Sequence, residues 1–101
     1  MSYIPKPIDT SAVQLPDDLL ELAERLAKNA HDVWARRKLD DQWTLGPLDD
    51  KDGKKHPDLI PYERLSEDKK QYDRDIATET IKAILALGYA IGKPGSQPAK
   101  A

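Results

Sequence analysis

The chain of 101 residues has no cysteine and no phenylalanine, and only two tryptophans and four tyrosines. Without cysteine, disulfides, cysteine-based zinc sites and thiol catalysis are excluded, and we expect a reducing, cytoplasmic environment. No run of about 18 apolar residues occurs, so we expect no transmembrane helix. The first seven residues also lack the apolar stretch of a signal peptide. Sixteen basic residues nearly balance 18 acidic ones, which argues against nucleic-acid and membrane-surface partners.

A length near 100 residues predicts one domain. We place it at residues 1–92 and expect the Pro-, Gly- and Lys-rich tail at 93–101 to be disordered. Because a chain of this size buries a limited part of its surface, a core of its own is marginal. Self-association, in the simplest case as a homodimer, is therefore an expectation.

Residues 16–38 are predicted to form the first helix, since acidic residues open the segment and basic residues close it. Apolar residues recur at i, i+3 and i+4 spacing, at positions 19, 22, 23, 26, 30 and 33. At about 100° per residue this stripe is centred near Leu26 and has Trp34 at its edge. His31 and Lys38 lie on a second, mixed flank.

Residues 66–88 are predicted to form the second helix, with Ser66 as N-cap and Gly88 just past the C-terminus. Its apolar arc covers roughly half of the circumference. The arc is a stripe of Tyr72, Ile76, Ala83 and Leu87, widened by Ala77, Ile81, Ile84 and Leu85. One partner helix cannot cover such an arc, so the remainder must meet other parts of the chain or another chain.

The other segments are predicted to be extended or looped. Residues 1–15 read as an extended arm because of their prolines, anchored by Ile4, Ile8, Val13 and Leu15. In the connection 39–65 we expect an ordered, packed loop with a short strand at 43–45, and a final strand at 89–91. The predicted fold is mainly α, with two antiparallel helices, a long ordered loop and short β segments.

Motifs for catalysis or metal binding are weak. Asp50–Gly53 has the look of a calcium loop, but leucines occupy two of the positions that must supply oxygen ligands. The adjacent His31 and Asp32 could serve a metal-dependent hydrolase, but only one further histidine exists, and neighbouring side chains on a helix point about 100° apart. We therefore predict no catalytic residue, no metal site, no cofactor and no enzymatic activity.

One grouping has the chemistry of a binding site. His31, Trp34 and Lys38 are neighbours on one helix flank, and His56 lies in the loop that can approach them. An aromatic plane beside a cation and a histidine can hold an adenine-like ring and its phosphates. Two other interpretations stay open, since Trp34 could belong to the core with solvated polar neighbours, or could anchor a homodimer.

Several blocks of sequence together resemble a known family. They are Tyr3–Thr10, Leu15–Pro16, Leu22–Ala35, Trp43–Pro47, His56–Tyr62 and Thr78–Tyr89. In order and spacing these blocks are similar to the RyR domain, the repeat of ryanodine receptors that also occurs in small stand-alone microbial proteins. The resemblance covers residues 3–91.

The resemblance implies a helix pair with short strands and an ordered loop. Receptor repeats occur as tandem pairs with pseudo-twofold symmetry, so a chain with one copy is expected to form a homodimer. As non-catalytic cytosolic parts of a calcium-release channel, the receptor repeats imply an interaction or structural domain. Microbial members resemble nucleotide-sensing modules, which implies an alternative role as a small-ligand sensor.

For the sensor role the resemblance carries over His31 and Trp34 as ligand-binding residues, and more weakly Lys38 and His56. Many repeats have Gly-Trp where this chain has Gln42-Trp43, so we expect a different turn before Trp43.

Overall fold

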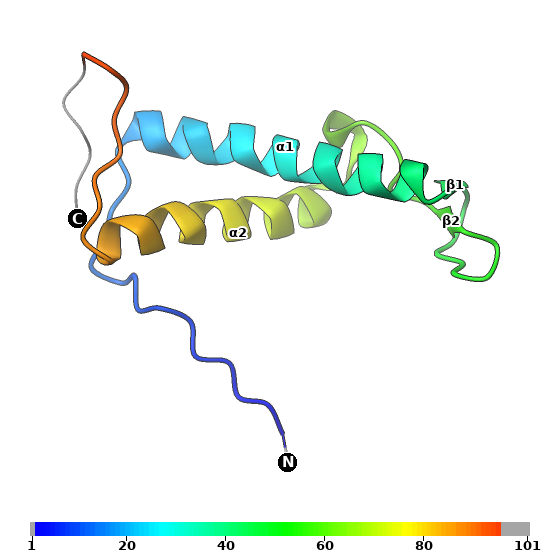
Figure 1. Ribbon diagram of the computed structural model, residues 1–101, viewed down its shortest axis with the longest axis horizontal. Helices are drawn as coiled ribbons and strands as arrows, with labels where there is room; N and C mark the ends of the chain where they lie inside the picture. Colours follow the sequence, from blue (N-terminus) through cyan, green and yellow to red (C-terminus); the bar gives the residue numbers. More distant parts are fainter. Residues whose placement is uncertain (1, 96–101) are drawn as a thin grey trace.

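The computed structural model describes residues 2–95 and is mainly helical, as predicted. Two long helices run antiparallel to each other, and the loop segment between them folds against the C-terminal end of the first (Figure 1). The elements in chain order are α1 (Asp17–Asp40), β1 (Thr44–Leu45), β2 (Lys55–His56), the 3₁₀ helix η1 (Tyr62–Arg64) and α2 (Glu67–Ala86). Most of the predicted tail, residues 96–101, lies outside the described residues.

Helix α2 has the two ends that its sequence predicts. The Ser66 hydroxyl accepts a hydrogen bond from the Lys69 backbone N–H at 3.3 Å, so it caps the first turn. At the other end Gly88 adopts φ +96°. The N–H groups of Gly88 and Tyr89 donate to the carbonyls of Leu85 and Ile84, which is the bonding of a Schellman motif.

Helix α1 ends in the same motif with a glutamine in the glycine position. Gln42 has φ +72°, and its N–H donates to the Leu39 carbonyl at 3.0 Å, while the Trp43 N–H donates to the Lys38 carbonyl at 2.9 Å. The turn before Trp43 therefore matches the one at Gly88 in its hydrogen bonds. Gln42 therefore adopts the left-handed backbone conformation at a steric cost that a glycine would not have.

The two short strands form a parallel pair in which Thr44 is opposite Lys55 and Leu45 is opposite His56. The strand predicted at residues 43–45 is confirmed as β1, whereas β2 was not predicted. The strand predicted at residues 89–91 is reduced to one bridge residue, Ile91, whose side chain packs against the core.

The buried stripe of α1 differs from the predicted one. It consists of Leu19, Ala23, Ala27 and His31, whereas Leu26 and Val33 are 39% and 60% exposed. The stripe is rotated toward the predicted mixed flank. Leu19 and Ala23 belong to both stripes. Ala27 explains the rotation, because a small side chain at a helix contact lets the partner helix approach closely.

Helix α2 likewise buries the narrower part of its apolar arc. Ala77, Ile81 and Leu85 face the core, where Ile81 and Leu85 are each only 1% exposed. The predicted stripe through Tyr72 and Ile76 lies on the exposed surface instead. The described part of this chain therefore leaves one apolar face of α2 uncovered.

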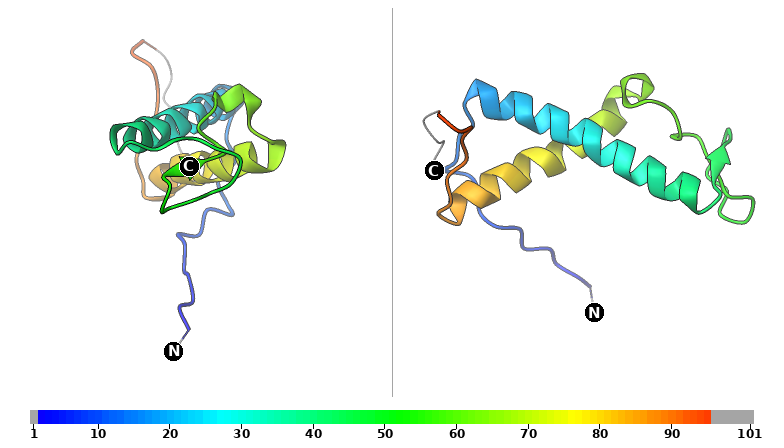
Figure 2. Two further views of the ribbon diagram at one scale, coloured as in Figure 1. Left: turned by 90° about the vertical axis from the view of Figure 1, so that its right-hand side faces the viewer. Right: turned by 45° about the horizontal axis from the view of Figure 1, so that its top comes forward.

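The N-terminal arm packs less than predicted. Val13 is buried and Leu15 packs against the core, but the expected anchors Ile4 and Ile8 are exposed, as is Tyr3. Figures 1 and 2 show the arm leaving the helix pair near the C-terminal end of α2 and running away from it. Tyr3 and Ile4 are the most exposed of these side chains, because the extended backbone diverges from α2 toward the N-terminus (Figure 2).

Candidate functional site

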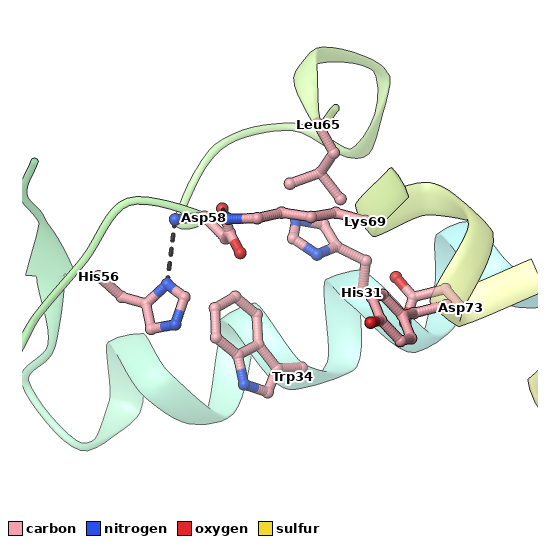
Figure 3. Close-up of a pocket in the computed structure, with 8 residues that line it drawn as sticks. His31, Trp34, His56, Asp58, Leu65, Lys69 and Asp73 are labelled. Carbon is pink, nitrogen blue, oxygen red and sulfur yellow. Dashed lines mark hydrogen bonds and ion pairs between the residues drawn. The ribbon is translucent and has the colours of Figure 1, made fainter. Parts of the chain in front are cut away.

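A cleft of about 370 Å³ opens where the C-terminal half of α1 meets the start of α2 and the loop after β2 (Figure 3). It is lined by His31, Trp34, His56, Asp58, Leu65, Lys69, Tyr72 and Asp73. Three of the four residues predicted for a binding site, His31, Trp34 and His56, are thus brought together from segments up to 25 residues apart.

His31 is buried, with only 5% of its surface exposed. Its Nε2 lies 2.7 Å from the Ile60 carbonyl, and because a carbonyl can only accept, this nitrogen carries the proton. The imidazole ring lies 5.5 Å from the Trp34 ring and 6.2 Å from the Tyr62 ring. The sequence predicted His31 on a mixed flank of the helix. The hydrogen bond to the Ile60 carbonyl offsets the cost of burying the imidazole and fixes the ring at the base of the cleft.

His56 forms the opposite wall. Its Nδ1 accepts a hydrogen bond from the Asp58 backbone N–H at 3.0 Å, so its ring orientation is fixed by the loop. The ring meets Trp34 edge-on, with centroids 4.8 Å apart and an interplanar angle of 76°. Trp34 therefore packs between two histidines, at 5.5 Å and 4.8 Å, while it is still partly exposed to the cleft.

Of the charged side chains that line the cleft, some have an ion-pair partner among the described residues and one does not. Lys69 forms an ion pair with Asp58. Burial raises the pKa of Asp73, and the nearby His31 opposes that shift. Within residues 2–95 the Asp73 carboxylate makes no hydrogen bond or ion pair, so it is free to accept one from a ligand.

Lys38 does not line the cleft. Its Nζ lies over the Trp43 ring, 4.0 Å from the centroid, in the geometry of a cation–π contact. The residue predicted to bind phosphates thus holds the start of the loop against α1.

A family model for the RyR domain matches residues 3–93, nearly the whole chain. The chain belongs to the RyR domain family. The resemblance drawn from the sequence blocks is thereby confirmed. Within residues 2–95 of this RyR domain, no helix is long and apolar enough to cross a membrane.

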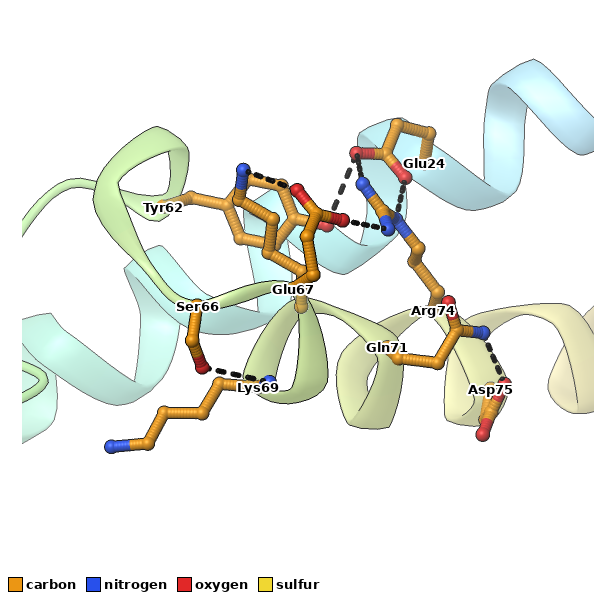
Figure 4. Close-up of polar contacts among 9 residues, drawn as sticks. Glu24, Tyr62, Ser66, Glu67, Lys69, Gln71, Arg74 and Asp75 are labelled. Atoms are coloured by element: carbon orange, nitrogen blue, oxygen red, sulfur yellow. Dashed lines mark hydrogen bonds and ion pairs between the residues drawn. The ribbon is translucent and has the colours of Figure 1, made fainter.

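Beyond the cleft, a polar cluster ties the two helices and η1 together (Figure 4). Arg74 donates from Nε and Nη2 to the two oxygens of Glu24, at 2.6 and 3.2 Å, and the Tyr62 hydroxyl donates to the same carboxylate at 3.1 Å. The guanidinium holds the pKa of Glu24 below its usual range. The cluster fixes α2 and η1 against α1, and so fixes the walls of the cleft.

The groups that the cleft of this RyR domain brings together can bind a ligand. Among the described residues no group of three His, Asp or Glu side chains lies close enough to hold a metal ion. His31 is buried and Asp32 is exposed, so the pair considered for hydrolysis does not converge. The cleft offers an aromatic ring, two oriented imidazoles and one free carboxylate.

Sequence reasoning missed Asp58, Lys69 and Asp73. Lys69 and Asp73 are one helical turn apart, a spacing that carries no signal for a site by itself. Only the antiparallel packing of α2 on α1 brings them opposite His31 and Trp34, so no local pattern could have identified them.

Proposed function

We propose that this RyR domain is a non-enzymatic, cytoplasmic interaction module that acts as a homodimer. The observation that carries the proposal is the uncovered apolar face of α2 together with the exposed apolar arm. Exposed apolar surface gathered on one face of a small domain is typical of a protein–protein contact. Family membership supports the same role, since RyR domains in general are repeat modules without catalytic activity.

Sedimentation velocity over a range of protein concentrations tests the homodimer. We expect a dimer at tens of micromolar and a shift toward monomer on dilution. A single monomeric species throughout that range would contradict the homodimer.

We propose small-ligand sensing at the Trp34 cleft as a second function. The supporting observation is the partly exposed Trp34 ring between His31 and His56, with Asp73 free beside it. A purine-like ring can stack on Trp34 and a ribose hydroxyl can donate to Asp73. Because Asp58 already neutralises Lys69, phosphate groups gain little here, and adenosine and ATP should bind with similar affinity.

Tryptophan fluorescence and thermal unfolding with adenosine, ATP, ADP-ribose and a cyclic nucleotide test the sensor. The Trp43→Phe variant leaves Trp34 as the sole tryptophan, and Trp34→Phe is its matched control. A ligand present at a hundredfold excess over its Kd stabilises the domain by about 2.7 kcal/mol. Unchanged fluorescence and melting temperature across the panel would exclude these ligands.

A further inference from the structure

The uncovered face of α2 forms a continuous stripe. Its members are Tyr72, Ile76, Ala83 and Leu87, which fall within about 60° of one another at 100° per residue. Tyr72, Ile76 and Leu87 are each more than 60% exposed. Helix α1 also exposes apolar residues, namely Leu20, Leu26, Val33 and Leu39. Of these, Leu26 and Val33 lie about 20° apart on one side of the helix, while Leu20 and Leu39 point elsewhere. The stripe on α2 is the larger and more exposed of the two apolar surfaces.

The spacing of this stripe is symmetric about its middle. Tyr72 and Leu87 lie equally far from the point between Glu79 and Thr80, and so do Ile76 and Ala83. When two such helices pack antiparallel, Tyr72 of one copy meets Leu87 of the other, and the large Ile76 meets the small Ala83. The face is therefore complementary to itself, as a twofold contact requires.

We infer that two copies of the chain pair through the outer stripe of α2, antiparallel, about a twofold axis between Glu79 and Thr80. The inference rests on the proposed homodimer and names its interface.

Charges at the edge of the stripe fit the same arrangement. Asp75, Glu79 and Lys82 lie along one edge of α2, and a twofold axis across antiparallel helices brings like edges together. Lys82 of each copy then lies beside Asp75 and Glu79 of the other.

The N-terminal arm lies beside the outer stripe of α2. Between arm residues 7–11 and α2 lies a groove of about 820 Å³, on whose helix side are Ile76, Thr80 and Ala83. The Thr10 hydroxyl donates to Glu79 at 2.6 Å and holds the base of the arm at this place, while the rest of the arm diverges (Figure 2). Arm residues 7–11 and the middle of the stripe are therefore walls of one groove, and a partner helix that packs on the stripe packs against the arm or displaces it.

The exposed side chains of the stripe supply part of the area that a stable dimer needs. A covered tyrosine contributes about 150–250 Å², so the two Tyr72 side chains supply about a fifth to a third of a standard interface of about 1,600 Å². Ile76 and Leu87 of both copies add to this, and Tyr3 and Ile4 of each exposed arm can cover the second copy. The central Thr80 and Ala83 are small enough to let the helices approach closely.

The arrangement also connects the interface to the cleft. Tyr72 lines the Trp34 cleft and ends the stripe, so Leu87 of the second copy would pack against a wall of that cleft. Each cleft would then be completed by the other chain.

Ile76→Asp tests the interface, with Val33→Asp as the matched control because Val33 is similarly exposed, at 60% against 68%, on α1. We expect Ile76→Asp to raise the dimer dissociation constant at least a hundredfold in sedimentation experiments, and Val33→Asp to leave it unchanged. Circular dichroism checks that both variants are folded. If Ile76→Asp dimerises as well as the control, the interface lies elsewhere and the inference is wrong while the homodimer stands. If the unaltered chain is monomeric, the homodimer itself fails.

A second measurement does not depend on a disruptive variant. Because the chain lacks cysteine, Thr80→Cys introduces a single thiol near the proposed axis, and Val33→Cys places one on α1. We expect a short bis-maleimide to link Thr80→Cys chains into covalent dimers and to leave Val33→Cys chains monomeric. Equal linking of the two variants, or none with Thr80→Cys, would overturn the inference.

Discussion

The two helices bury similar stripes but differ on their other faces. Both stripes repeat every fourth residue, from Leu19 to His31 in α1 and from Ala77 to Leu85 in α2. Next to its stripe, α1 is covered by its own chain at Trp34, onto which the loop after β2 packs, although Leu26 and Val33 stay exposed. The second apolar face of α2 receives no such cover. Apolar periodicity therefore shows how much of a helix needs a partner, but not whether that partner belongs to the same chain.

The largest effect should separate the inner and outer faces of α2. Ile81→Ala should lower the free energy of unfolding by about 2–5 kcal/mol, because it leaves a cavity among fully buried neighbours. Ile76→Ala, on the outer face, should change it by less than about 0.5 kcal/mol. Urea unfolding at concentrations too low for association measures both. Equal losses would mean that the two faces are packed alike.

The next effect concerns the one polar member of the α1 stripe. His31→Ala should cost about 1–3 kcal/mol, since it leaves the Ile60 carbonyl without its donor. His31→Gln, which keeps a donor, should cost less. Trp34 fluorescence should also change, because the His31 ring lies 5.5 Å away. A loss of stability without a change in fluorescence would argue that His31 does not shape the cleft.

Glu24→Gln tests the polar cluster that joins the helices. At pH 7 it should cost about 0.5–1 kcal/mol, a small amount because the carboxylate is 45% exposed and water screens the pair. Arg74 lowers the pKa of Glu24 in the folded state, so this stabilisation is present above the ordinary pKa of 4.5 and is lost as pH falls through the folded pKa.

Unfolding of Glu24→Gln and the unaltered chain from pH 7 to pH 3 measures the effect. The difference between the two should disappear at the acid end. Glu21→Gln, at an exposed site on the same helix, is the matched control, and a parallel trend in it would refute the assignment to the Arg74 pair.

An effect of similar size compares the two helix ends. Gln42→Gly should stabilise the domain by about 0.5–1 kcal/mol. Glycine adopts φ +72° without the steric cost that glutamine has, and this gain exceeds the larger loss of chain entropy of glycine on folding. Gly88→Ala should destabilise by about 1 kcal/mol for the opposite reason, because nothing lies within 4 Å of an added methyl group and only the backbone conformation is strained. Thermal unfolding measures both, and changes of the same sign would rule out this explanation.

Local signals explain what the sequence predicts correctly. Ser66 and Gly88 define the ends of α2 because their side chains, or the lack of one, act on the adjacent turn. Leu19 and Ala23 of the buried α1 stripe were predicted, but Ala27 and His31 were not. Ala27 carries little hydrophobic signal and His31 is polar, so only close packing against α2 shows their role. Asp58 and Asp73 could not be predicted as part of the site, because only tertiary packing of the loop and α2 brings them to Trp34.

The hydrogen bond from His31 to Ile60 has a consequence for local unfolding. It joins residues 29 positions apart and ties the loop that contains both strands to α1. If the loop unfolds cooperatively, the bond from His31 to Ile60 and the strand bonds donated by the Thr44 and Gly46 amides break in the same event. Those amides should therefore share one rate of hydrogen exchange, faster than that of the paired helices. Each opening also uncovers Trp34, so the Trp34 cleft exists only while the loop is closed.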